Sequence, residues 1–341
     1  MIYIIITLLN LGTEAAELLT FKKSFRSLNE DCCKSTNLLS CENVDVDSSA
    51  LHNGDDLTMP GGVTVSFSNS IDPNGYFYTN GEGDEVLITY NHEKEHMFGS
   101  MKTSIGKSYA IEKCEGSHVW QEFDMQSFID DEAIMSTRFS SPLTGLPDTQ
   151  SFDLTSMSTY SVMIYYTPEF EAITSDIGGF IDQVLAETNQ GYANSKVPIT
   201  IKKHCMERAT ISDMEQSSDL LEAFSNMKPI VDLRNTADSA VLLAAEFGAC
   251  GRAYLTTVFT GNTLSITRKS CALGYFSFGH ELGHNFGLYH NKEITTNPNY
   301  AHGHGHLIEK GSASTGYRTI LAYYQNGHAR RVNYYSNPSV S

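Results

Sequence analysis

Three histidines and one glutamate stand close together in the C-terminal quarter of this 341-residue chain. The stretch from His280 to His290 reads His-Glu-Leu-Gly-His-Asn-Phe-Gly-Leu-Tyr-His. Residues four apart on an α-helix project from the same face, so His280 and His284 point toward one position. Glu281 lies about 100° around the helix from His280 and is better placed to reach a water held on a metal than the metal itself. The spacing therefore predicts a metal site with Glu281 as its general base.

The third ligand must come from a chain that turns back after the helix. Gly287 can end a helix in a left-handed conformation without steric cost, and His290 then arrives from the turned segment. Three imidazoles with an open fourth position are typical of catalytic zinc, whereas structural zinc is usually closed by four ligands rich in cysteine. No cysteine lies between residues 280 and 290. We expect one catalytic Zn²⁺ held by His280, His284 and His290.

The pattern His-Glu-x-x-His-x-x-Gly-x-x-His resembles the signature of the metzincin zinc endopeptidases at every fixed position. The chain is most similar to their reprolysin-like branch, which includes secreted peptidases of the peptidyl-Asp metalloendopeptidase type. The resemblance covers roughly residues 159–340. It implies an α/β fold (α+β, metzincin-like), with a twisted mixed β-sheet and the zinc-site helix in one catalytic domain. It also implies that the region in front is a propeptide.

Three further positions follow from this resemblance. Leu321 stands where metzincins carry the methionine of a tight turn beneath the zinc, and leucine has nearly the same volume. Tyr323 matches a tyrosine that stands near the metal in some relatives, where it is either oxyanion support or a packed side chain. Cys114, in the expected propeptide, is either a thiolate switch on the open zinc position, a disulfide partner or a buried thiol.

The pattern of predicted secondary structure differs between the two halves of the chain. From about 63 to 122, short alternating runs separated by Gly, Asn and Asp predict a small mainly-β domain, followed by a linker around 124–156. Beyond it, strands alternate with helices, among them a helix from Pro168 to about Asn189, which predicts a mixed, largely parallel sheet. We therefore expect a propeptide over 17–150 and a catalytic domain over 157–341. Because relatives usually continue past Asn337 into a closing helix, we expect the C-terminus to be truncated.

Composition indicates the compartment. The formal net charge is −17, and residues 1–156 hold 9 Lys and Arg against 24 Asp and Glu, which argues against nucleic acid or an anionic membrane as a partner. The apolar run at the start is too short to span a bilayer and predicts a signal peptide over 1–16, with a buried strand as the alternative. Seven cysteines then suggest disulfides in a secreted protein, and Cys250 with Cys271 is the pair we favour, because both bracket one region before the zinc helix.

Together these residues predict a secreted zinc-dependent metalloendopeptidase in which Glu281 activates a zinc-bound water. Its expected partners are protein or peptide substrates and extracellular inhibitors, with no membrane span and no nucleic acid. The alternative is a catalytically impaired zinc-binding or adhesion module on the same scaffold. Leu321 is the only feature in its favour, and Glu281 argues against it, because a binding module needs no base beside the metal.

Overall fold

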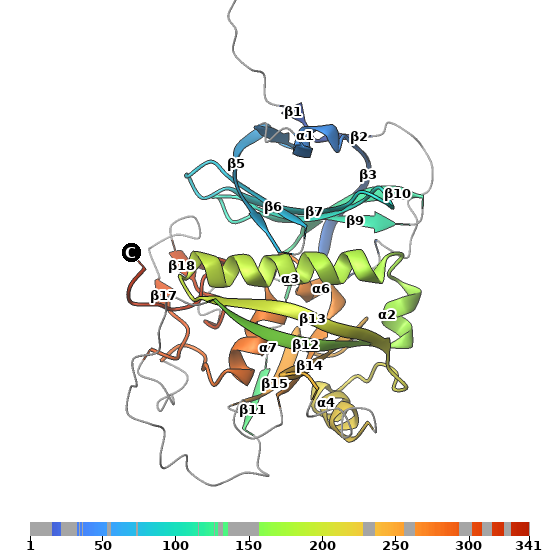
Figure 1. The fold of residues 1–341 in the computed structure, drawn as a ribbon, viewed down its shortest axis with the longest axis vertical. Coiled ribbons are helices and arrows are strands. Elements are labelled where there is room, and N and C mark those ends of the chain that lie inside the picture. The colour runs from blue at the N-terminus through green and yellow to red at the C-terminus, as the bar shows by residue number, and fades with distance from the viewer. Residues whose placement is uncertain are drawn as a thin grey trace, which may run out of the picture.

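The computed structural model describes residues 16–21, 33, 35, 37–52, 56–72, 74–114, 116–125, 127–128, 132–135, 157–227, 236–255, 263–292, 302–308, 316–323 and 329–340. The segment 1–16 expected to be a signal peptide lies outside the described residues, except for its last residue, Ala16. Two β-sheets are stacked with the long helix α3 (Ile177–Asn194) between them (Figure 1). The N-terminal sheet covers one side of α3, and the six-stranded sheet that includes β12 and β13 lies on the other.

The N-terminal sheet has ten strands in the order β1-β4-β5-β6-β7-β8-β9-β10-β3-β2. All its neighbours are antiparallel except β1 and β4. The strands, with the short helix α1 (Ser49–His52), are β1 (Ala16–Glu17), β2 (Leu19–Phe21), β3 (Leu38–Val46), β4 (Leu57–Met59), β5 (Val63–Ile71), β6 (Gly75–Thr79), β7 (Glu85–Asn91), β8 (His96–Lys102), β9 (Ser108–Cys114) and β10 (Ser117–Phe123).

This sheet starts earlier in the chain than the sequence indicated. The mainly-β region was expected to begin at about residue 63, yet β3 pairs along most of its length with β10. Its sequence, Leu-Leu-Ser-Cys-Glu-Asn-Val-Asp-Val, buries only Val44 fully, so its hydrophobic alternation is weak. The pairing with β10 therefore decides its conformation more than its own pattern does.

The second sheet has six strands in the order β11-β15-β16-β14-β12-β13. Its pairs are parallel except β15 with β16, which confirms the mixed, largely parallel sheet. The strands are β11 (Glu132–Met135), β12 (Ser158–Tyr166), β13 (Ile199–Arg208), β14 (Ser239–Ala244), β15 (Gly251–Leu255) and β16 (Leu264–Arg268). β11 belongs to the segment expected to be a linker, so part of that segment is a strand on the edge of this sheet.

Helix α3 is buried on two sides, because it packs against both the N-terminal sheet and the six-stranded sheet. Phe180, Ile181 and Val184 lie in the main core beneath the six-stranded sheet. On the side of the N-terminal sheet, the Gln183 amide donates to the backbone carbonyl of Leu87 at 3.1 Å. The single helix expected from Pro168 onward is in fact two, α2 (Pro168–Ala172) and α3.

The break between these helices has a local cause. The side chain of Asp176 accepts a hydrogen bond from the backbone N–H of Gly179 and so caps the first turn of α3. A capping aspartate starts a new helix rather than extending the previous one.

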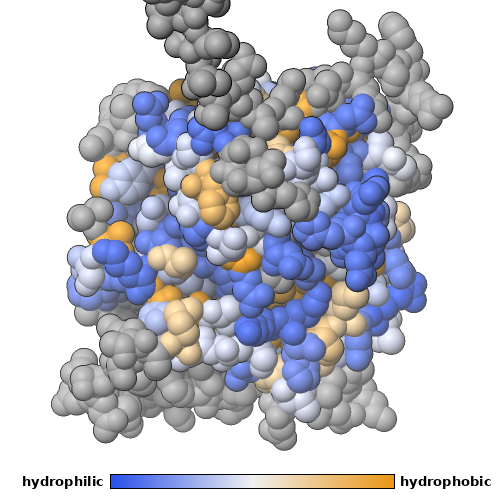
Figure 2. Space-filling view, turned by 45° about the horizontal axis from the view of Figure 1, so that its top comes forward, coloured by the Kyte–Doolittle hydropathy of each residue, from blue (hydrophilic) through white to orange (hydrophobic). Residues whose placement is uncertain are grey.

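The remaining elements are α4 (Ser217–Asn226), α6 (Lys269–Ala272), α7 (Ser277–Asn285), β17 (Leu307–Ile308), β18 (Gly316–Arg318) and β19 (Ala329–Arg331). The last three strands form a small sheet of their own after the zinc-site motif. Within the described part of the chain, no helix combines the length and the apolar character needed to cross a membrane. On the face in Figure 2, polar side chains predominate and hydrophobic ones are scattered among them.

Candidate active site

Helix α7 carries the first half of the metal-site motif. Every residue of α7 is buried, and His280 and His284 lie one turn apart on it. The helix ends as the sequence indicated: Gly287 has φ +85°, and the N–H of Leu288 donates to the carbonyl of Gly283 at 2.9 Å. This reversal returns the chain toward the helix within three residues.

The three histidines converge on one point. The Nε2 atom of His284 lies 2.9 Å from the Nε2 atoms of both His280 and His290, and the latter two are 3.3 Å apart. Nitrogen ligands at about 2.0–2.1 Å from a tetrahedral zinc stand about 3.3 Å from one another, so the three atoms nearly match that arrangement. Among the described residues, this is the only group of three or more His, Cys, Asp or Glu side chains that could hold a metal ion.

The other ring nitrogens orient two of these imidazoles. Nδ1 of His280 lies 2.7 Å from the carbonyl oxygen of Ile320, and Nδ1 of His284 lies 2.8 Å from that of Leu288. Each Nδ1–H can donate to its carbonyl, which leaves the lone pair on Nε2 for a metal, as is usual for metal-binding histidines.

Burial keeps the three rings neutral, which is the form that binds a metal. It lowers the pKa of His284 to about 4 and that of His290 to about 2. For His280 the pKa also falls well below its ordinary value, chiefly through burial and then through the nearby His284 and Arg331. Their chemistry and spacing fit zinc.

Glu281 lies on α7 beside the ligands and is fully buried. Its side chain rests against the backbone of Gly251 on β15: a Cβ atom at position 251 would stand 2.7 Å from Cγ of Glu281 and 2.8 Å from its Cδ. Only glycine leaves this space, so residue 251 fixes how closely the carboxylate approaches the sheet. The motif did not reveal this glycine, and no local pattern around Gly251 could have done so.

Leu321 lies in the turn expected beneath the site. The turn runs from Thr319 to Ala322, closed by a backbone hydrogen bond of 3.0 Å, and Leu321 is 2% exposed. A Cβ at Gly283 would lie 2.9 Å from Cδ2 of Leu321, so the leucine packs directly against α7 between the two helical histidines. Tyr323 follows, with its ring centroid 3.7 Å from that of His290. The structure thus brings both residues to the three histidines.

Arg331 on β19 is a neighbour of the site that the sequence did not reveal. Its Nη2 atom lies 2.9 Å from Nδ1 of His280, and Nη1 donates to the carbonyl of Tyr275 at 2.8 Å. Arg331 is 2% exposed. It is 41 residues beyond His290 and belongs to no recognised motif, so only the fold brings it here.

The pairing of the cysteines bears on the role of Cys114, for which a zinc switch, a disulfide and a buried thiol were all considered. Cys114 is disulfide-bonded in the N-terminal sheet, and its partner lies outside the described residues. A disulfide sulfur offers no thiolate, so the structure favours the disulfide reading of Cys114 over the zinc switch. The pair Cys250–Cys271 is confirmed, and Cys33 is joined to Cys41. Cys205 is a free thiol.

The fold and the geometry of the site together define a class of protein. A mixed sheet, a buried helix with two histidines and a third histidine after a glycine reversal form a three-histidine metal centre with an adjacent glutamate. This is the arrangement of a metal-dependent hydrolase domain.

Comparison with known proteins gives the family. A model of metallo-peptidase family M12B, reprolysin-like, matches residues 180–291. The peptidyl-Asp metalloendopeptidase of Pseudomonas fragi is 32% identical over 158 residues, which cover 46% of this chain and 85% of that protein. The chain therefore belongs to the reprolysin-like metalloendopeptidases, a family that uses zinc.

Two other similarities are weaker, the first in the share of the relative that is covered and the second in structural agreement. The peptidyl-Asp metalloendopeptidase of Stenotrophomonas maltophilia (strain K279a) is 34% identical over 179 residues, half of this chain but only 42% of the length of that relative. Among solved structures, metalloproteinase-II from Bacteroides fragilis aligns with a TM-score of 0.37 and 12% identity over 72% of this chain and 85% of its own, a likeness too low to carry an argument.

Proposed function

We propose that this chain is a zinc-dependent metalloendopeptidase that hydrolyses peptide bonds in proteins. The observation that carries the proposal is the convergence of three neutral imidazole Nε2 atoms within 3.3 Å of one another, beside a buried carboxylate on the same helix. Zinc at this position supplies a Lewis acid and lowers the pKa of a bound water. The ligands would be His280, His284 and His290.

Glu281 is the general base of this proposal. It takes the proton of the attacking water and passes it to the leaving amine, as a carboxylate adjacent to the ligands can do. Its contact with Gly251 holds the side chain close to β15 instead of letting it swing freely. Tyr323, whose ring lies against that of His290, is the side chain whose hydroxyl we assign to the developing oxyanion.

The proposal also covers the class of substrate and the location of the protein. Relatives carry the name peptidyl-Asp metalloendopeptidase, and we assign this chain peptide substrates that contain aspartate. The disulfides Cys33–Cys41 and Cys250–Cys271 support secretion, because disulfides persist in oxidising compartments. Extracellular inhibitors belong to the same proposal.

The N-terminal region is the propeptide in this account. β11 forms a parallel pair with β15, Glu132 to Met135 opposite Arg252 to Leu255. β15 is the strand against which Glu281 rests, and its outer edge is the place where an extended peptide would add to the sheet. While β11 occupies that edge, a substrate strand has no backbone partner there. Latency then comes from an occupied sheet edge rather than from the Cys114 sulfur.

Metal removal and restoration test the activity. The whole chain, cleaved in the linker region, should degrade casein; a chelator should abolish cleavage, and about one equivalent of Zn²⁺ should restore it. His290→Ala should lose both zinc and cleavage while remaining folded, as judged by circular dichroism. If wild-type protein binds one zinc yet cleaves nothing after its linker is cut, the alternative of a zinc-binding or adhesion module replaces the peptidase.

A further inference from the structure

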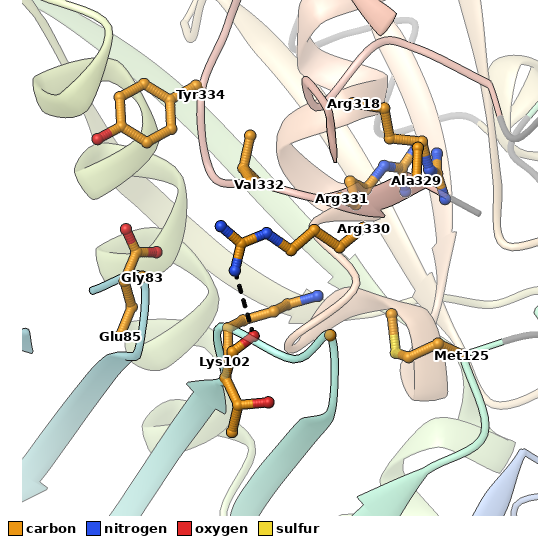
Figure 3. Close-up of a pocket in the computed structure, with 12 residues that line it drawn as sticks. Gly83, Glu85, Lys102, Met125, Arg318, Ala329, Arg330, Arg331, Val332 and Tyr334 are labelled. Atoms are coloured by element: carbon orange, nitrogen blue, oxygen red, sulfur yellow. Dashed lines mark hydrogen bonds between the residues drawn. The ribbon is translucent and has the colours of Figure 1, made fainter. Parts of the chain in front are cut away.

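A cavity of about 200 Å³ lies between the N-terminal sheet and the strand β19. Figure 3 shows it with the side chains that line it. β7, β8 and the turns next to them contribute Gly83, Glu85 and Lys102, and β18 and β19 contribute Arg318, Arg330 and Arg331. Four cationic side chains therefore line one small cavity in which Glu85 is the only acidic residue. This is unexpected in a chain of net charge −17.

Lys102 is the first of these cations, and the positive charges around it favour a bound anion. Its Nζ lies 4.6 Å from the centroid of the Phe276 ring, and no carboxylate of the described residues forms an ion pair with it. Burial lowers the pKa of Lys102 to about 7; the carboxylates of Glu187 and Glu85 oppose that shift, whereas Arg331 and Arg318 add to it. Lys102 is half-buried, and an ammonium partly withdrawn from water near two guanidinium groups is unfavourable unless negative charge compensates it.

Arg330 is the second cation, and its guanidinium lies against backbone atoms of the N-terminal sheet and its turns. Its Nη1 donates to the carbonyl of Ser104 at 3.0 Å and reaches that of Thr103 at 3.4 Å. Gly83, at φ +100°, lies under the guanidinium: a Cβ there would stand 3.0 Å from Nη2. Both hydrogen bonds of Arg330 are to neutral carbonyls, and among the cavity residues Glu85 is the one carboxylate whose charge acts on its guanidinium.

We propose that this cavity is a binding site for a small oxyanion, held mainly by Lys102 and Arg330. The Lys102 ammonium and the Arg330 guanidinium both belong to side chains that line this cavity (Figure 3), and hydrogen bonds between such groups and an anionic oxygen are about twice as strong as neutral ones. The volume admits a sulfate or a phosphate, or the carboxylate end of an acidic side chain. Because Lys102 comes from the N-terminal sheet and Arg330 from the C-terminal strands, the anion joins the two.

Calorimetric titration of the whole chain tests this site without reference to peptide cleavage. Sodium sulfate and, separately, sodium acetate are titrated at pH 7 with ionic strength held constant by NaCl. We expect saturable binding of one sulfate per chain, weakened at least 10-fold by Arg330→Gln and by Lys102→Met. Saturable binding of acetate as well would extend the ligand class to carboxylates, and sulfate alone would restrict it to tetrahedral oxyanions.

Lys202→Gln is the matched control, because it removes one positive charge from an exposed side chain on β13, outside the cavity. Its sulfate affinity should stay within about twofold of wild type. Arg330→Lys keeps the charge and should retain most of the binding, which guards against a variant that merely fails to fold. The proposal fails if wild-type protein shows no saturable binding, or if Arg330→Gln binds sulfate as well as the control does.

Discussion

Gly251 gives the sharpest structural test of how the base is held. A methyl group at this position would stand 2.7 Å from Cγ of Glu281, whereas carbon atoms in ordinary contact are about 3.5–4.0 Å apart. The side chain of Glu281 must therefore move by at least about 0.8 Å in Gly251→Ala. Displacements of about 1 Å in a catalytic group cost on the order of 10²-fold in rate. We expect kcat for casein or peptide cleavage to fall by about 10- to 100-fold, with zinc content unchanged.

Stability must be measured beside activity, because overpacking a core typically costs about 1–3 kcal/mol. Gly178→Ala is the matched control, since a Cβ there meets only ordinary contacts of 3.6 Å and more. It should leave kcat and zinc content unchanged. A fully active Gly251→Ala enzyme would refute the reasoning, because Glu281 would then tolerate a large shift or would not be the base. Loss of zinc in Gly251→Ala would instead show that residue 251 supports the ligands.

Three other predictions follow from the same structure. Tyr323→Phe should lower kcat on the order of 10²-fold while zinc remains bound; an unchanged kcat would assign the ring to packing alone. Lys269→Met should lower the free energy of unfolding in urea by about 3–5 kcal/mol, because it strands the buried Glu112 carboxylate 2.7 Å away, whereas Lys269→Met/Glu112→Leu should recover most of it; equal stability of the two variants would contradict this. In zinc-free protein, burial lowers the pKa of His284 to about 4, so the unfolded state binds more protons below its ordinary pKa near 6.5; the contribution of His284 to stability is full above that pH and falls by about 1.4 kcal/mol per pH unit toward pH 4. His280 and His290 are also held neutral and add slopes of their own, so His284→Gln should make the fall of stability with pH shallower by about that amount, and an unchanged slope would contradict this.

The metal centre was the most predictable part of the molecule, because its information is local. Four-residue spacing on a helix fixes His280 and His284, and Gly287 specifies the reversal that returns His290. The alternating strands and helices likewise specified the mixed sheet, since hydrophobic periodicity and connection order act at short range. The disulfide between Cys250 and Cys271 followed from their places on either side of one region.

What the sequence did not reveal depends on contacts between distant segments. β3 is polar and becomes a strand through β10, and β11 becomes one through β15 across more than a hundred residues. Gly251 and Arg331 reach the site only because the sheet and β19 fold back onto α7. α3 appears amphipathic because it presents polar side chains to the N-terminal sheet. One of them is Glu187, whose carboxylate accepts a hydrogen bond from the Ser100 hydroxyl at 2.6 Å.

The central claim is that zinc at the three histidines and the carboxylate of Glu281 together hydrolyse peptide bonds. The most direct measurement is casein cleavage with bound zinc quantified in the same samples, for linker-cleaved wild-type protein and for Glu281→Gln. We predict about one zinc per chain in both proteins and cleavage only in wild type. Equal cleavage by the two proteins would contradict the role of Glu281, and zinc-loaded wild-type protein without any cleavage would contradict the peptidase itself.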